Sequence, residues 1–140
     1  VAVLHRLAGS PSVSGKMPFT DVASGTWYYD AVLWASQNGI VAGMSETTFA
    51  PQENITREQI VAIFSRYTAK FSPDKTEAAA ELTGFADSAS VSDWALGDMK
   101  WAVAYKVING SPSAGKLYLN PQGNATRAEV ATILMQYRAL

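Results

Sequence analysis

A stretch of this chain occurs twice. Residues 19–22 (FTDV) recur as residues 85–88 (FADS), and residues 56–60 (TREQI) recur as residues 126–130 (TRAEV). Between these blocks each copy carries two tryptophans seven residues apart and then a glycine, namely Trp27, Trp34 and Gly43, and Trp94, Trp101 and Gly110. The distance between matching residues grows from 66 to 70 along the chain, as small loop insertions would cause. Such a repeat predicts units that pack against one another.

The opening residues follow the same pattern. Residues 3–7 (VLHRL) match residues 63–67 (IFSRY), which lie near the end of the next copy. We therefore predict that the chain begins inside a truncated first copy. The predicted organisation is a terminal helix and linker over residues 1–15, a second repeat over 16–71, a linker rich in turn-forming and charged residues over 72–84, and a third repeat over 85–140.

Each copy is predicted to form two helices joined by a loop. Apolar residues spaced three and four apart mark one face of the later helix, at Ile60, Ile63, Phe64, Tyr67 and Phe71 in the second copy. This helix starts at a threonine with Gln or Glu three residues on, which is the pattern of a capping box. The earlier helix is expected at about residues 27–38 and 94–106. Gly39 fits a left-handed stop after the first of these, whereas Lys106 at the matching place leaves a different ending open.

The predicted fold is therefore all-α, built from tandem helix-loop-helix repeats of which the N-terminal one is truncated. A helix pair this short cannot bury its own apolar face, so neighbouring repeats must pack together.

The composition narrows the possible functions. Eleven Lys and Arg against twelve Asp and Glu give a net charge of −1, so no global field favours nucleic acid or an anionic membrane. Without cysteine and with one histidine, the chain offers no disulfide, no thiolate metal site and no multi-histidine centre. Neither a nucleophile elbow nor a phosphate-binding glycine loop is present. We expect a non-catalytic protein with no cofactor, no metal, no nucleic-acid partner and no membrane insertion.

In the order and spacing of its motifs the sequence resembles the S-layer homology family of bacterial cell-wall anchoring modules. The features are the FxDV opening at residues 19–22, a tryptophan-bearing first helix, NGIVxG at 38–43, FxP at 49–51 and ITREQ at 55–59, with a close match to the family's TRAE run at 126–129. The resemblance implies a pseudo-threefold helical spindle. It also implies an extracellular, cell-wall location and binding of an acidic, typically pyruvylated, secondary cell-wall polysaccharide in grooves between repeats.

Arg57 and Arg127 occupy the arginine position of this motif, directly after a capping threonine. A guanidinium beside free amides at a helix start can hold a carboxylate through charge-assisted hydrogen bonds. The alternatives are an ion pair with a nearby acid such as Glu53, or simple solvation. Glu58 adds negative charge beside Arg57 where the family usually has alanine.

Six further residues are candidates for the ligand site. Trp27 and Trp94 lie at expected helix starts and could offer an aromatic face to a sugar, although tryptophans in such a repeat also serve as core. Asp21 and Asp87 match the family's aspartate, and could cap a helix or form a turn instead of touching ligand. Gly43 and Gly110 suit positive φ, and glycine also lets a ligand approach the backbone closely.

Two other functions stay open. The chain could be a protein-protein interaction or assembly module, including self-association through the truncated repeat, or a targeting appendage of a secreted enzyme.

Overall fold

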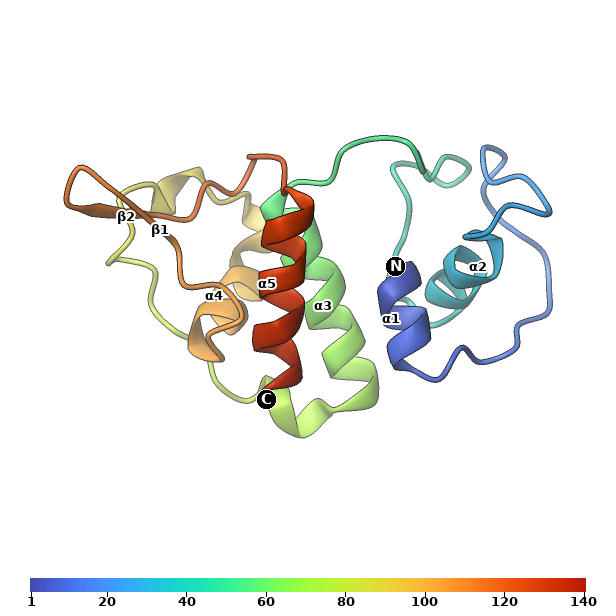
Figure 1. Ribbon diagram of the computed structural model, residues 1–140, viewed down its shortest axis with the longest axis horizontal. Coiled ribbons are helices and arrows are strands. Elements are labelled where there is room, and N and C mark those ends of the chain that lie inside the picture. Colours follow the sequence, from blue (N-terminus) through green and yellow to red (C-terminus); the bar gives the residue numbers. More distant parts are fainter. The chain divides into compact units, whose positions relative to one another are not determined.

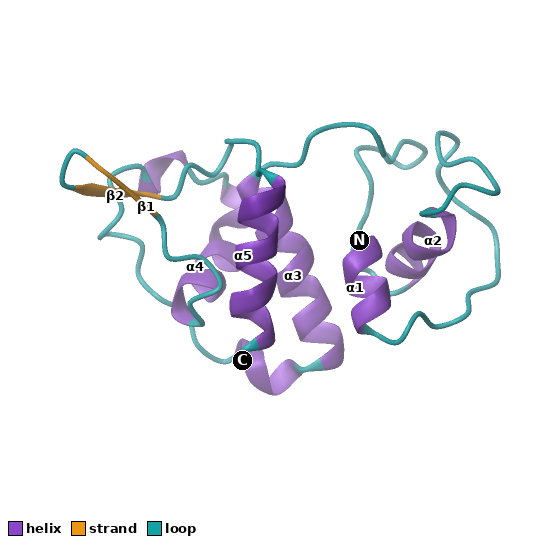
Figure 2. Ribbon diagram, viewed as in Figure 1, coloured by secondary structure: helices purple, strands orange, loops and turns teal.

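The computed structural model describes all residues 1–140 and divides them into two compact units, Val1–Glu53 and Asn54–Leu140 (Figure 1). The fold is mostly helical, as predicted, with one small two-stranded sheet that was not expected (Figure 2). The boundary between the units falls inside the predicted second repeat. Its two helices therefore belong to different units, each of which we describe separately.

The first unit contains α1 (Ala2–Leu7) and α2 (Tyr29–Gln37), which pack against each other. The buried residues of α2 lie in one run, Ala31–Ala35. A second part of this core forms under the FxDV loop, where Phe19 and Val22 pack with Val32.

The second unit is built around α3 (Arg57–Phe71), α4 (Leu96–Ala104) and α5 (Arg127–Arg138). Short 3₁₀ helices η1 (Pro73–Thr76), η2 (Ser88–Ser90) and η3 (Asp93–Ala95) connect α3 to α4. α4 packs on α3, and α5 runs alongside α3 (Figure 1). The Tyr137 ring from α5 lies 4.9 Å from Phe64 and 6.5 Å from Trp101, so one aromatic cluster joins the three helices.

Both predicted capping boxes are confirmed. The Thr56 hydroxyl accepts from the backbone N–H of Gln59 at 3.2 Å, and the Gln59 side chain accepts from the Thr56 N–H at 2.9 Å. Thr126 and Glu129 repeat this arrangement at the start of α5. These boxes explain why the two helix starts lie where the sequence indicates, because each box needs only residues within one turn.

The earlier helices are shorter than predicted. α2 begins at Tyr29 and α4 at Leu96, and neither has a side chain that caps its start. Their ends are alike despite the difference in sequence, since Lys106 adopts a φ of 58° where Gly39 has 70°. Val107 then donates to the carbonyl of Ala102, five residues earlier, as Ile40 does to Ala35. Packing thus forces a lysine into a left-handed conformation that disfavours side chains by about 1–2 kcal/mol.

The unexpected sheet corrects the prediction of an entirely α-helical fold. Strands β1 (Ser111–Ser113) and β2 (Lys116–Tyr118) pair antiparallel, with Ser111 opposite Tyr118. Ala114 and Gly115 turn the chain between them at φ values of 50° and 78°, which suits a two-residue hairpin. Three-residue strands are too short to show an alternating pattern, so sequence periodicity could not reveal them.

Candidate functional site

Asp21 and Asp87 hold matching turns. Asp21 accepts from the backbone N–H of Phe49 at 2.9 Å and of Ala50 at 2.7 Å. Asp87 accepts from Leu119 and Asn120, each at 2.8 Å. In both turns the second donor has positive φ, 60° at Ala50 and 48° at Asn120. Of the roles open to these aspartates, the structure therefore shows the turn-forming one, with both carboxylate oxygens engaged.

The two hydrogen bonds to Asp21 lower the pKa of its carboxyl below the usual value of 3.8. A carboxyl whose pKa is depressed by folding stabilises the folded state above its ordinary pKa, and this stabilisation is lost as the pH falls through the lower, folded-state pKa. We expect Asp21→Asn to be less stable than wild type at neutral pH, with a gap that narrows as the pH drops below about 4. Denaturant unfolding at a series of pH values measures this.

The matched control is Glu46→Gln in the same unit, because Glu46 is exposed and makes no hydrogen bond. Its pH profile should follow that of the wild type. A stability gap for Asp21→Asn that stays constant from neutral pH to pH 2 would contradict the assignment.

Gly43 and Gly110 make room for the phenylalanine of each FxD motif. Both have positive φ, 80° and 81°. A Cβ on Gly43 would overlap the Phe19 ring, and one on Gly110 would overlap the Phe85 ring. The sequence predicted the positive φ, and the ring contact is an additional reason for glycine at these positions.

The four tryptophans divide into two pairs. Trp34 and Trp101 are each 4% exposed and belong to the core, whereas Trp27 is 77% and Trp94 53% exposed. The second pair therefore presents aromatic surface to solvent, as their expected places at helix starts suggested. Trp94 lies in η3 and Trp27 lies two residues before α2.

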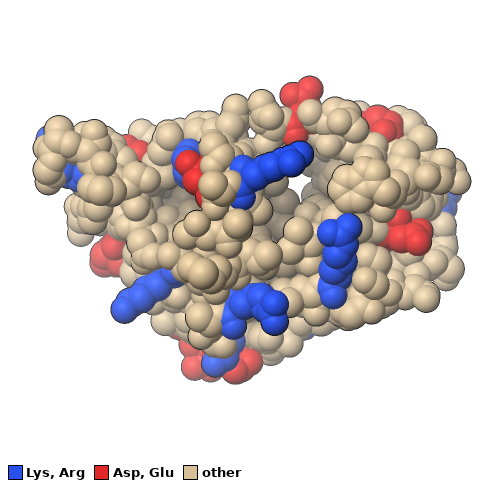
Figure 3. Space-filling view, viewed as in Figure 1, with Lys and Arg blue, Asp and Glu red and all other residues tan.

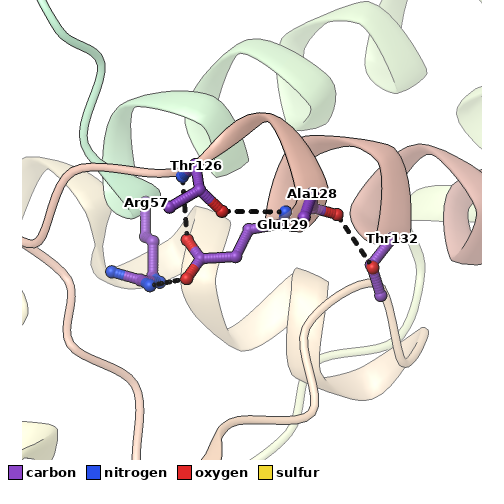
Figure 4. A network of polar contacts seen from close by, with 5 residues as sticks. All are labelled: Arg57, Thr126, Ala128, Glu129 and Thr132. Atoms are coloured by element: carbon purple, nitrogen blue, oxygen red, sulfur yellow. Dashed lines mark hydrogen bonds and ion pairs between the residues drawn. The ribbon is translucent and has the colours of Figure 1, made fainter.

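Arg57 is engaged within the protein. Its guanidinium forms an ion pair with Glu129 at the start of α5 (Figure 4). The backbone N–H groups of the first two residues of α3 also have partners outside the helix. Arg57 N–H donates to the Gly123 carbonyl and Glu58 N–H to the Pro121 carbonyl, each at 3.0 Å. Of the alternatives for Arg57, the structure therefore shows an ion pair, although its partner is Glu129 and not Glu53.

Glu58, which the sequence suggested would add negative charge beside Arg57, is a buried hydrogen-bond acceptor. It is 4% exposed and accepts from the Ser92 hydroxyl at 2.7 Å, the Ser92 N–H at 3.1 Å and the Gln122 side chain at 3.3 Å. The Glu58 carboxylate thus accepts hydrogen bonds from three donors. Ser92 immediately precedes η3, so Glu58 holds the turn that carries Trp94. The only sequence signal was that the other copy has Ala128 at this place.

Arg127 differs from Arg57 both in its side chain and in the backbone amides at its helix start. Its side chain is exposed and makes no hydrogen bond or ion pair. The backbone N–H groups of Arg127 and Ala128 are also without partners, because the capping box satisfies only the N–H of Glu129 and that of Thr126. A free arginine is thus the first residue of a twelve-residue helix whose first two amides have no partner, and a helix start of this kind can hold an anion.

The second unit brings together Arg57, Arg127 and Asp87 with the loop that joins β2 to α5. Trp94 is tied to the same region through Ser92 and Glu58. Trp27, Asp21 and Gly43 belong to the other unit. No group of three or more His, Cys, Asp and Glu side chains is arranged to hold a metal ion. None of the helices has the length and apolarity to cross a bilayer.

A model of the S-layer homology domain matches residues 18–61 and 84–131. The chain is 37% identical over 119 residues to the surface-layer 125 kDa protein of Lysinibacillus sphaericus, covering 85% of this chain and 10% of that protein. It is 35% identical over 133 residues to the amylopullulanase of Thermoanaerobacterium thermosulfurigenes, covering 95% of this chain and 7% of the enzyme. It is also 37% identical over 116 residues to exoglucanase XynX of Acetivibrio thermocellus, covering 83% and 10%. No solved structure gives a significant match.

The chain thus spans a tenth or less of the length of these relatives, and the relatives with enzyme names match through their S-layer homology region. Two matched segments in one chain agree with the repeats found in its sequence. The chain belongs to the S-layer homology domain family, a binding module of proteins that lie outside the cell in association with its wall.

Proposed function

We propose that this chain is a non-catalytic anchor that attaches a larger secreted protein to an acidic, pyruvylated secondary cell-wall polysaccharide. In this proposal the repeats complete a pseudo-threefold spindle and the polymer lies in grooves between them. The observation that carries the proposal is the start of α5, where Arg127 is exposed without a partner and the backbone amides of the first two helical residues are also unpartnered.

The chemistry of this helix start suits a carboxylate such as that of a pyruvate ketal. A guanidinium presents a planar fork of donors that matches both carboxylate oxygens. A hydrogen bond to a charged group contributes about 1.5–3 kcal/mol. The surrounding surface supplies no broad electrostatic attraction, since the face drawn in Figure 3 carries separate acidic and basic side chains in a largely uncharged surface. Recognition would therefore depend on this local arrangement.

The other candidate residues have different parts in the proposal. Trp94 and Trp27 offer exposed aromatic faces to sugar rings. Asp21, Asp87, Gly43 and Gly110 act through the loops that they hold, which form the groove walls. For Arg57 to contribute directly, the ligand carboxylate would have to replace Glu129. Several weak contacts along a polymer would strengthen one another through effective concentration.

The test compares sedimentation of the chain with purified cell walls before and after the acidic polymer is extracted. We expect the chain to pellet with intact walls and to stay in the supernatant with extracted walls. Adding free polymer should also release it from intact walls, and raising the ionic strength should weaken pelleting because salt screens exposed charges. Equal pelleting with both wall preparations would refute the proposed ligand.

The exposure of apolar side chains on α5 supports assembly with another protein as a second candidate function. α5 is less covered than α3, because Ala131 is exposed where its counterpart Val61 is fully buried, and Met135 is 67% exposed. Exposed apolar side chains on one helix favour contact with another protein surface. Analytical ultracentrifugation separates the two functions, since a dimer that ignores wall fragments would favour assembly.

A further inference from the structure

Glu58 is a buried carboxylate that no cation neutralises. Its side chain is 4% exposed, and the single ion pair of the chain joins Arg57 to Glu129 instead. Burying a charge is costly in free energy unless hydrogen bonds compensate for the water that is lost. For Glu58 the compensation comes from neutral donors, on Ser92 and Gln122. A buried charge of this kind can serve to fix one specific arrangement of the segments around it.

The groups around Glu58 come from separate segments of the third repeat. Its carboxylate accepts from the Ser92 hydroxyl at 2.7 Å and from the Ser92 N–H at 3.1 Å. The Gln122 amide donates to both carboxylate oxygens at 3.3 Å, and to the Ser90 carbonyl at 2.6 Å. The start of α3 is thereby tied to η2, to the residue before η3 and to the loop before α5. We call these contacts of Glu58, Ser92, Gln122 and the Ser90 carbonyl the clamp.

The clamp fixes the turn that carries Trp94. Ser92 is the N-cap of η3, and its carbonyl accepts from the Ala95 N–H at 2.9 Å, so the clamp and the short helix share this residue. Trp94 is the middle residue of η3 and is 53% exposed. A three-residue 3₁₀ helix has little stability of its own, because its hydrogen bonds are poorly aligned and too few. Contacts from outside must therefore hold it, and the clamp supplies them.

The side chains that form the clamp are not repeated elsewhere in the chain. In the other copy their places are taken by two residues without a polar side chain and by an exposed glutamine without a side-chain hydrogen bond, namely Ala128, Gly25 and Gln52. Trp27, the counterpart of Trp94, is 77% exposed and lies outside any helix. The clamp thus orders one of the two exposed tryptophans.

From these contacts we propose that Glu58 is a positioning residue, which holds Trp94 in the orientation that binds the wall polymer. The inference rests on the proposed function, in which Trp94 offers its aromatic face to that polymer. A side chain that is ordered before the ligand arrives loses less conformational entropy on binding, and the affinity is higher for this reason. Glu58 itself is buried and contributes to binding through Ser92 and Trp94.

The first test removes donors of the clamp that are not part of the core. Ser92→Ala deletes the hydroxyl donor and Gln122→Ala deletes the amide donor. We expect each variant to bind purified acidic polymer about two- to tenfold more weakly in titration calorimetry, which is the usual entropy of ordering one side chain expressed as affinity. The matched controls are Ser90→Ala and Gln52→Ala, whose side chains make no hydrogen bond. Both should bind like wild type.

A double-mutant cycle with Trp94→Ala shows whether the clamp acts through this tryptophan. Ser92→Ala should weaken polymer binding when Trp94 is present and should have no further effect when Trp94 is absent. If the clamp only stabilised the fold, Ser92→Ala would lower the affinity by the same factor in both backgrounds. Equal factors would therefore overturn the positioning role.

Quenching of tryptophan fluorescence by acrylamide tests the clamp without any ligand. In Trp27→Phe protein the accessible emission comes from Trp94, because the other two tryptophans are each 4% exposed. Adding Glu58→Ala should raise the quenching constant, since the turn is no longer held. Adding Glu58→Gln instead should keep the constant near its original value, because the glutamine carbonyl can still accept from Ser92. An unchanged constant in the folded Glu58→Ala protein would overturn the inference.

These experiments distinguish a failure of the inference from a failure of the proposed function. If the wild type binds the acidic polymer and both Ser92→Ala and Gln122→Ala bind it equally well, the positioning role is wrong and the proposed function stands. If the wild type does not bind the polymer, the proposed function is wrong, and the role of Glu58 in binding falls with it.

Discussion

Replacing Arg127 with alanine should lower the affinity for the acidic wall polymer by about 10- to 100-fold. The physical reason is the loss of the equivalent of one charge-assisted hydrogen bond, which contributes about 1.5–3 kcal/mol, where about 1.4 kcal/mol corresponds to a tenfold change in affinity. The free guanidinium and the two unpartnered amides at the start of α5 are the basis of this expectation. Titration of purified polymer into the wild type and the variant measures it.

Arg138→Ala is a matched control, because Arg138 is an exposed arginine at the opposite end of the same helix. It should keep the wild-type affinity. Arg57→Ala should affect binding less than Arg127→Ala, since Arg57 already pairs with Glu129, and its partly exposed ion pair contributes less than about 1 kcal/mol to stability. If Arg127→Ala and Arg138→Ala bind the polymer equally, Arg127 has no specific role.

Replacing Tyr137 with alanine should lower the free energy of unfolding of the second unit by about 3–5 kcal/mol, the usual cost of removing a large buried aromatic side chain. Tyr137 is 8% exposed and its ring packs against Phe64 and Trp101, so its removal would leave a cavity where α3, α4 and α5 meet. Its hydroxyl also bonds to the buried Thr68 at 3.0 Å. Urea unfolding followed by circular dichroism measures the loss.

Tyr137→Phe separates the ring from the hydroxyl. Because Thr68 can still donate to the Phe64 carbonyl at 2.7 Å, this variant should lose only about 1 kcal/mol, the net contribution of one hydrogen bond. If the alanine variant were no less stable than the phenylalanine variant, the aromatic cluster would not be what holds the three helices together.

The pattern in the sequence predicted those features that depend on neighbouring residues. The capping boxes at Thr56 and Thr126 were predictable because a threonine and the residue three positions later satisfy each other within one turn. The exposure of Trp27 and Trp94 followed from their places near loops. The repeat itself indicated that Asp21 and Asp87 would have equal roles, and they hold equivalent turns.

Features that join distant segments could not be predicted in this way. The partner of Arg57 is 72 residues away, and nothing near Arg57 in the chain identifies it. The place of Glu58 in the sequence suggested a negative charge beside Arg57, but the fold buries the Glu58 side chain against Ser92. The two strands are too short to show a period, and Lys106 enters a left-handed conformation that its residue type disfavours.

The sequence alone therefore determined the two matching copies, the starts of the later helices and the family, because each depends on residue spacing or on contacts within a turn. Only the tertiary structure decided which of two equivalent arginines is free. The loop of residues 121–123 and Glu129 cover the start of α3, whereas no segment of the chain satisfies the first two amides of α5. The two helix starts have the same local chemistry, and they differ because packing between repeats covers one and leaves the other open.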